Sequence, residues 1–248
     1  MPSESANMPD VAILCGGLGT RLRSAVADRP KALAEVAGRP FLAWLLDLLD
    51  FHSFQRVVLC TGYQAEQIEA EFGAQYKGLH LEYSQEPSLV GTGGALRHAL
   101  PLIRSSSVLV MNGDSYCHAD LASFWRGHIA AHSVTSMVLV HVEDSSRFGS
   151  VQLNSEENIS AFQEKTVSAG PGWINAGIYL ASRALLQAIP QNTVCSLERE
   201  VFPMWIKLGL RGVKSDGPFI DIGTPESYAS ANRIFHKLTA TQFQSTRA

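Results

Sequence analysis

The stretch Val11-Ala-Ile-Leu-Cys15 runs directly into Gly16-Gly17-Leu18-Gly19-Thr20-Arg21-Leu22, and the expected architecture starts from it. Five consecutive apolar residues that end at two glycines predict a buried strand entering a tight loop. Three glycines in four positions let backbone N–H groups approach an anion, because no Cβ stands in the way. We therefore expect the first strand of a sheet to lead into a loop that can hold an anion.

This loop differs from two familiar phosphate-binding loops. It has no Lys-Ser or Lys-Thr to complete GxxxxGK[ST], and GxGxxG would place Leu22 at its third glycine. Two cations follow instead, Arg21 at the end of the loop and Lys31 ten residues later. Arginine offers a fork for phosphate oxygens and lysine a point charge. A phosphate site is one interpretation; a glycine turn with two solvated cations is the other.

Strands and helices alternate through the first half of the chain. Apolar runs predict strands at 56–60, 79–83 and 108–111, and helical periodicity predicts helices at 41–51, 64–72, 93–100 and 121–132. This alternation is typical of a mostly parallel sheet with helices on both faces. After residue 133 the strand-like segments 135–142, 149–153, 159–162 and 173–180 follow one another, which predicts a smaller antiparallel or mixed extension. Helical patterns return at 196–208 and from 225 onward.

Composition excludes several classes of protein. The 248 residues carry 20 Lys+Arg against 23 Asp+Glu, a net charge of −3, which argues against a nucleic-acid partner that needs a strongly basic face. The first ten residues are polar and are expected to be flexible, and no apolar run is long enough to span a bilayer, so no membrane partner is expected. The four cysteines are widely spaced and are expected to be buried thiols of a cytoplasmic protein.

Ligands of open α/β sheets bind beyond the carboxyl ends of the strands. This rule directs attention to residues 16–21, 85–94 and 112–114 and to Asp221. Asp114 and Asp221 both follow predicted strands, so one sheet edge could hold both carboxylates. A single Asp after a strand is more often a helix cap, and that alternative stays open for each of them.

The glycine loop followed by Pro30-Lys31 closely resembles the signature of the sugar-1-phosphate nucleotidyltransferases. Five further segments resemble other motifs of that family in the same order, at 85–95, 112–114, 164–165, 175–177 and 221–225. The resemblance covers residues 11–235. It implies a Rossmann-like fold in one catalytic domain at 11–240, with a nucleotide half at about 11–132, a sugar half at about 133–225 and a C-terminal helix at about 225–240.

The resemblance also implies a reaction and a role for each matching residue. An NTP and a sugar 1-phosphate would give an NDP-sugar and pyrophosphate, and Mg²⁺ would be the cofactor. The catalytic residues would be Arg21, Lys31, Asp114 and Asp221, of which Asp114 and Asp221 would hold the metal. The nucleotide would be bound by Leu14, Gly16, Gly17, Gly19, Thr20, Arg21, Gln85, Gly91 and Thr92. The sugar phosphate would be bound by Gly149, Glu164, Lys165, Asn175 and Gly177.

Within that family the chain most resembles the heptose 1-phosphate guanylyltransferases, which favours GTP and D-glycero-α-D-manno-heptose 1-phosphate. Hexose 1-phosphate uridylyl-, thymidylyl- and cytidylyltransferases remain open. So does a catalytically silent regulatory subunit, although the expected cations and carboxylates are all present. The sequence leaves the oligomeric state open, a homodimer included.

Overall fold

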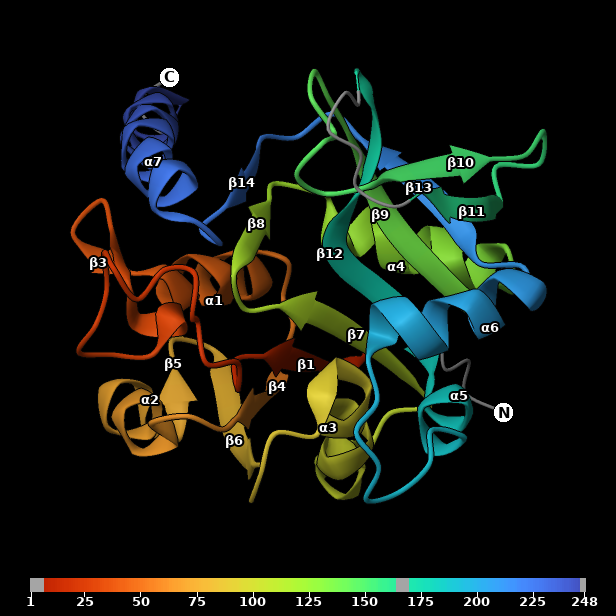
Figure 1. Ribbon diagram of the computed structural model, residues 1–248, viewed down its shortest axis with the longest axis horizontal. Helices are drawn as coiled ribbons and strands as arrows, with labels where there is room; N and C mark the ends of the chain where they lie inside the picture. The colour runs from red at the N-terminus through yellow and green to blue at the C-terminus, as the bar shows by residue number, and fades with distance from the viewer. Residues whose placement is uncertain (1–6, 164–169, 246–248) are drawn as a thin grey trace.

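A computed structural model describes residues 7–163 and 170–245, and its centre is an eight-stranded sheet (Figure 1). In spatial order, with the antiparallel strands third and eighth, the sheet reads β13 (Arg211–Ser215), β9 (Thr135–Val142), β12 (Gly172–Ser182), β7 (Ser107–Asn112), β1 (Asp10–Leu14), β4 (Arg56–Thr61), β6 (Leu79–Gln85) and β5 (Gln75–Tyr76). Within the described residues, six strands of this sheet run in one direction, and the other two, β12 and β5, run antiparallel to their neighbours.

Helices cover both faces of this sheet. One core cluster holds residues of α1 (Phe41–Phe51), α2 (Ala65–Phe72), α4 (Leu121–Ala130) and α7 (Pro225–Ser245). The other holds residues of α3 (Gly91–Ala99), α5 (Arg183–Gln187), the π-helix η4 (Leu197–Val201) and α6 (Phe202–Lys207). Two 3₁₀ turns, η2 (Lys31–Leu33) and η3 (Leu100–Leu102), complete the helical segments of the described chain.

Strand β1 shows why the chain folds this way. Val11 and Ile13 pack into the first cluster while Ala12, between them, packs into the second. Successive side chains of a strand point to opposite faces, so a strand covered on both sides must be apolar throughout. The continuous apolar run at 11–15 therefore produces a central strand, as predicted. The structure starts β1 at Asp10, whose buried carboxylate accepts backbone N–H bonds from Arg104 and Ser105.

Three two-stranded antiparallel sheets accompany the main sheet in the described residues: β2 (Glu35–Val36) with β3 (Arg39–Pro40), β10 (Ser150–Leu153) with β11 (Ile159–Gln163), and β8 (Ser115–Cys117) with β14 (Phe219–Asp221). The third pair lies beside α7 (Figure 1). It places Asp221 opposite Ser115, and the N–H of Ile222 donates to the carbonyl of Asp114 at 3.0 Å. The two predicted metal carboxylates are thus brought together by this pair rather than by the main sheet.

The predicted fold class is confirmed, with differences in detail. Strand β12 is inserted between β7 and β9, so the second half of the chain extends the same sheet. The helix predicted at 196–208 is divided into a π-helical turn and α6. All four cysteines are free and buried. No helix among the described residues combines the length and the apolar character that crossing a membrane requires.

Candidate active site

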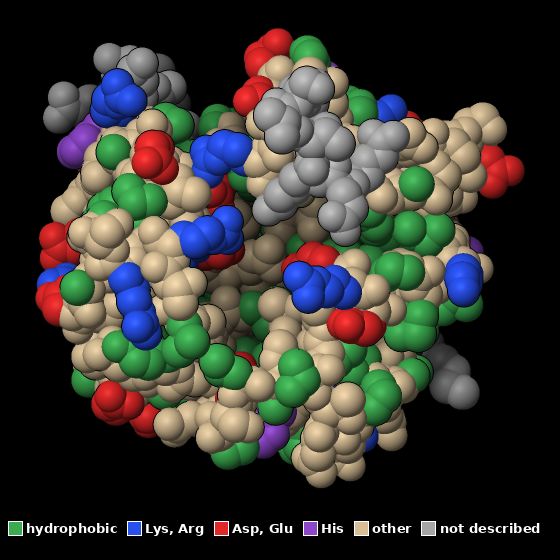
Figure 2. Space-filling model, in the orientation of Figure 1, with side chains coloured by type: hydrophobic (Ala, Val, Ile, Leu, Met, Phe, Trp, Pro, Cys, Tyr) green, Lys and Arg blue, Asp and Glu red, His purple; other side chains and the backbone are tan. Residues whose placement is uncertain are grey.

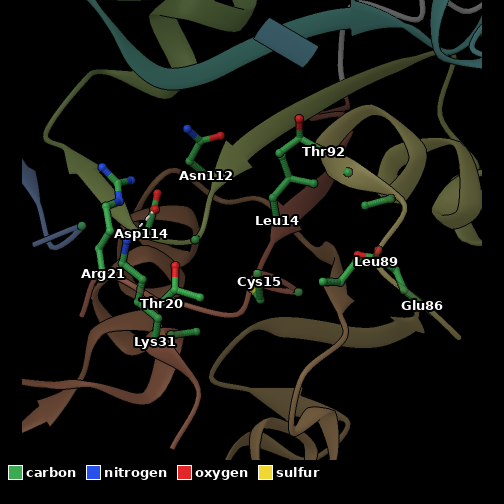
Figure 3. A pocket seen from close by; sticks show the side chains of 18 of the residues that line it. Leu14, Cys15, Thr20, Arg21, Lys31, Glu86, Leu89, Thr92, Asn112 and Asp114 are labelled. Carbon is green, nitrogen blue, oxygen red and sulfur yellow. Dashed lines mark hydrogen bonds and ion pairs between the residues drawn. The ribbon is translucent and has the colours of Figure 1, made fainter. Parts of the chain in front are cut away.

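A pocket of about 350 Å³ opens beyond the carboxyl ends of β1 and β7. The space-filling view shows a hollow near the centre of this face, with Lys and Arg side chains on both sides of it (Figure 2). The close-up shows two ends: Thr20, Arg21, Lys31 and Asp114 on one side and Glu86 and Leu89 on the other, with Leu14 and Cys15 between them (Figure 3). Its wall consists of Leu14, Cys15, Gly16, Gly17, Gly19, Thr20, Arg21, Lys31, Ala32, Glu86, Leu89, Gly91, Thr92, Ala95, Asn112, Gly113, Asp114, Glu198 and Gly223.

The glycine loop forms the floor of this pocket. The Cys15 N–H donates to the Cys60 carbonyl at 2.8 Å, which extends the β1–β4 pairing to the start of the loop. Gly19 has φ of +59°, a left-handed conformation that favours glycine. Its carbonyl accepts from the Leu22 N–H at 2.9 Å and closes the turn. After this turn, Thr20 and Arg21 line the pocket (Figure 3).

The cationic end contains an ion pair. The Lys31 Nζ lies 2.7 Å from Asp114 Oδ2, and the Lys31 side chain is 13% exposed against 40% for Asp114. Lys31 is placed there by η2, which follows Pro30, and Asp114 by the turn between β7 and β8. Arg21 lines the same end. Three of the four predicted catalytic side chains therefore share one end of one pocket.

Asp221, the fourth, is outside the wall of this pocket but adjoins it through Gly223, whose ideal Cβ would stand 2.9 Å from Asp221 Oδ2. Its Oδ1 accepts from Arg147 Nη2 at 3.1 Å and from the Ser227 hydroxyl at 3.3 Å. Arg147 was not among the residues predicted from the sequence. Each predicted metal carboxylate is thus paired with a cationic side chain.

The opposite end is marked by a carboxylate that the sequence analysis did not select. Glu86 Oε2 accepts the Val90 N–H at 3.2 Å, and Oε1 would stand 2.6 Å from a Cβ on Gly16. Burial is the main influence on its pKa and raises it above the usual value. Gln85, selected from the sequence for base recognition, is exposed at the end of β6 and is not part of the wall.

The glycines at the start of α3 make room for another segment of the chain. Gly91 has φ of +75°, and a Cβ there would stand 2.5 Å from the Cys195 carbonyl oxygen. That oxygen accepts the N–H groups of Gly93 and Gly94 at 2.8 and 3.3 Å. The contact also carries Glu198 to the pocket, where its Oε2 accepts the Thr92 hydroxyl at 3.2 Å. Glu198 is a second carboxylate that the sequence analysis missed.

The residues predicted to bind sugar phosphate have a different placement. Glu164 and Lys165 lie outside the described residues. Asn175 Oδ1 accepts the Gly177 N–H at 2.7 Å and its Nδ2 donates to the Tyr179 hydroxyl at 2.7 Å, so both ends of its amide hold the bulge of β12. Gly149 and Gly177 have positive φ of +78° and +77°. Among the described residues of this group, none is part of the pocket wall.

The donor set of Asp114 and Asp221 fits a hard divalent cation. Carboxylate oxygens are the ligands that Mg²⁺ prefers, and one or two suffice when substrate phosphates and waters complete the shell. The ammonium of Lys31 and the guanidinium of Arg147 already stand where such a charge would act. Among the described residues, no group of three or more His, Cys, Asp or Glu is arranged to hold a metal.

The fold and this pocket define a nucleotide-using transferase, and comparison with known proteins agrees. Residues 11–237 match the family described as Nucleotidyl transferase, and the chain belongs to that family. The family and the reaction class predicted from the sequence are thereby confirmed.

The chain is similar to several characterised members. It is 33% identical to the D-glycero-alpha-D-manno-heptose 1-phosphate guanylyltransferase of Aneurinibacillus thermoaerophilus, over 90% of this chain and 97% of the relative. It is 37% identical to the mannose-1-phosphate guanylyltransferase of Mycobacterium tuberculosis, over 88% of this chain and 62% of that longer relative. The crystal structure of HddC from Yersinia pseudotuberculosis complexed with GMP-PN superposes with a TM-score of 0.81 at 33% identity, covering 92% of this chain and all of that one.

Proposed function

We propose that the protein transfers the guanylyl group of GTP to a sugar 1-phosphate, with D-glycero-α-D-manno-heptose 1-phosphate as the favoured acceptor. The products are pyrophosphate and a GDP-sugar for polysaccharide or glycoconjugate biosynthesis. One observation carries the proposal: the pocket has the cationic side chains of Arg21 and Lys31 at one end and the half-buried Glu86 carboxylate at the other. The names of the relatives, heptose and mannose 1-phosphate guanylyltransferases, support both the base and the class of sugar.

Glu86 supports guanine because of its hydrogen-bonding pattern. An ionised carboxylate accepts hydrogen bonds and donates none. The edge of guanine presents two neighbouring donors, its N1–H and N2–H, to such a group. Uracil and thymine present one N–H between two carbonyl oxygens, which a carboxylate would repel. A base placed between Leu14 and Leu89 with its edge toward Glu86 would extend its phosphates toward Arg21.

In the proposed reaction an oxygen of the sugar phosphate attacks the α-phosphorus of GTP in line. The bond from the α-phosphorus to the bridging oxygen breaks, and pyrophosphate leaves with that electron pair. Arg21 neutralises the departing pyrophosphate, and Lys31 binds the α-phosphate. Positioning and charge neutralisation supply most of the rate in such a transfer. The glycine loop, with Gly16, Gly17, Gly19 and Thr20, holds the phosphates through its backbone.

We assign Mg²⁺ to Asp114 and Asp221. The ion would neutralise phosphate charge and polarise the phosphoryl group. Lys31 then has a second role, because it balances Asp114 before the substrates arrive and is available to the α-phosphate afterwards. We assign binding of the sugar and its phosphate to five residues of the second half of the chain: Gly149, Glu164, Lys165, Asn175 and Gly177.

Pyrophosphate release across five NTPs and a panel of sugar 1-phosphates tests the proposal. The panel includes heptose, mannose, glucose and N-acetylglucosamine 1-phosphates. We expect the highest kcat/KM with GTP and D-glycero-α-D-manno-heptose 1-phosphate, and no turnover in EDTA. A preference for UTP, dTTP or CTP, or full turnover in EDTA, would contradict the assignment of base or metal respectively.

Two neighbouring variants separate the candidates for base recognition. Glu86→Gln should lower kcat/KM for GTP by about 10- to 150-fold, because charge-assisted hydrogen bonds are lost. It should raise relative activity with UTP, since an amide both donates and accepts. Gln85→Ala is the matched control and should leave base selectivity unchanged. If Gln85→Ala blurred selectivity while Glu86→Gln preserved it, the sequence-based assignment would replace the structural one.

A further inference from the structure

Among the described residues, Arg147 alone forms an ion pair with Asp221, and the proposed reaction gives it no role. Its Nη2 lies 3.1 Å from Asp221 Oδ1 and 3.4 Å from the Thr224 hydroxyl oxygen. The Arg147 side chain is 43% exposed and that of Asp221 is 18% exposed. A carboxylate that the reaction needs for a metal is therefore held by a cation that solvent can reach.

The turn that carries Arg147 is well anchored. The backbone N–H groups of Phe148 and Gly149 both donate to the Ser145 carbonyl at 3.0 Å. The Phe148 ring packs edge-on against Phe219 of β14 at 5.5 Å, and the guanidinium lies over the Phe148 ring at 5.2 Å. The base of the side chain is thus fixed beside Asp221, while its charged end can change partners by rotation of its own bonds.

The same turn lies on the side of the molecule assigned to the sugar phosphate. The Ser145 N–H and hydroxyl both donate to the Gly170 carbonyl, at 3.2 and 3.0 Å. Gly149, two residues after Arg147, is one of the predicted sugar-phosphate residues. The side chain therefore extends from the sugar half toward the metal carboxylate.

We propose that Arg147 is the counter-ion of Asp221 in the free enzyme and a ligand of the sugar phosphate in the loaded enzyme. The inference rests on the proposed function. A divalent cation on Asp221 would repel the guanidinium, and an exposed ion pair is weak enough to exchange. The released guanidinium has the planar fork that suits phosphate oxygens. Arg147 would thereby be free to receive the second substrate when a metal is held by Asp221.

The test measures the affinity for Mn²⁺, which should rise in the variant, and the affinity for sugar 1-phosphate, which should fall. Mn²⁺ is titrated into the protein without substrates, and free Mn²⁺ is followed by its electron paramagnetic resonance signal. Arg147→Gln should bind Mn²⁺ up to about fivefold more tightly, the equivalent of the ~1 kcal/mol of an exposed ion pair. In turnover assays the KM for sugar 1-phosphate should rise about 10- to 150-fold, the range expected for a lost charge-assisted hydrogen bond. The KM for GTP should change little.

Two further variants complete the design. Arg147→Lys keeps the charge and should retain wild-type Mn²⁺ affinity and part of the sugar-phosphate affinity. Arg126→Gln, on α4 with a contact to Ser123, removes an exposed arginine elsewhere and should change neither quantity. Weaker Mn²⁺ binding by Arg147→Gln, or an unchanged sugar-phosphate KM, would overturn the proposal. An inactive wild-type protein would contradict the proposed function instead, and the Mn²⁺ titration would still test the counter-ion.

Discussion

At the Glu86 end of the pocket, backbone packs closely against neighbouring backbone and the Glu86 side chain, whereas charged side chains form ion pairs at the Arg21 end and beside it. A Cβ on Gly91 would clash with the Cys195 carbonyl, and a Cβ on Gly16 would clash with the Glu86 carboxylate. Lys31 with Asp114 and Arg147 with Asp221 are instead partly exposed pairs whose members can exchange. A close-packed wall selects by shape and transmits any change into the fold. Exchangeable ion pairs can be altered with the fold intact. Substitutions at the Arg21 end should therefore lower activity, whereas substitutions that add a Cβ at the Glu86 end should lower stability.

The largest expected effect on activity is at the Arg21 end of the pocket. Asp114→Asn removes a metal ligand and the partner of Lys31 in a side chain of the same shape. We expect kcat to fall by about 10³, since a metal contributes several kcal/mol of charge stabilisation. The melting temperature should stay within a few degrees of wild type. Asp50→Asn, whose carboxylate accepts the Gly78 N–H away from the pocket, is the control and should keep its kcat. Loss of the folded state in Asp114→Asn would break the comparison.

Arg21 gives the next largest effect. Arg21→Ala should lower kcat by about 10²–10³, as expected for one preorganised electrostatic group, and raise the KM for sugar phosphate much less. Arg23, two residues later, lies over the Tyr63 ring at 5.1 Å and is not part of the pocket wall. Arg23→Ala should therefore retain its kcat. Equal losses in the two variants would mean that the loop, rather than the Arg21 charge, had been disturbed.

At the Glu86 end of the pocket we expect a loss of stability of the folded state. Gly91→Ala places a Cβ at φ of +75° and against the Cys195 carbonyl. Backbone strain and overpacking together should cost about 2–4 kcal/mol of unfolding free energy. Thermal or urea unfolding measures it. Gly17→Ala is the matched control, because nothing lies within 4 Å of its ideal Cβ. It should fold normally and weaken binding of the triphosphate, which a stability loss at Gly17 would contradict.

The smallest effect is a pH dependence. Burial raises the pKa of Glu86, so the carboxyl takes up a proton at a higher pH than usual. Protonated Glu86 loses an acceptor for guanine, and GTP affinity should fall as pH falls through that raised pKa. The change should be at most about tenfold. Calorimetric titration with GTP from pH 8 to 5 measures it, and Glu86→Gln should lack this component. An affinity that strengthened with acid would contradict the assigned role.

The sequence predicted the central strands, and it also selected most of the residues that line the Arg21 end of the pocket. Continuous apolar runs can be assigned to a doubly covered sheet because both faces of each strand need apolar side chains. The glycine loop and Asp114 were selected because they follow predicted strands, whereas the role of Lys31 came from the family resemblance. Their convergence on one pocket is a finding of the structure, since sequence spacing alone gives no distance between residues 31 and 114.

The residues that were missed depend on orientation or on distant pairing. Gln85 has the more suitable side chain for a base with one donor and one acceptor, but it shares a strand face with Leu81 and Tyr83, which pack into the first core cluster. Glu86, beyond the strand end, turns into the pocket. Arg147 meets Asp221 74 residues later, and no local pattern announces that pairing. Glu198 reaches the pocket through the contact of Cys195 with α3.

The β8–β14 pair has a consequence for the order in which the site is assembled on the ribosome. Domains begin to fold from the N-terminus during synthesis. The glycine loop, Lys31 and Asp114 are translated more than 100 residues before Asp221, which joins them through three paired positions of β14. The Lys31–Asp114 ion pair and the glycine loop are therefore synthesised long before the second carboxylate exists.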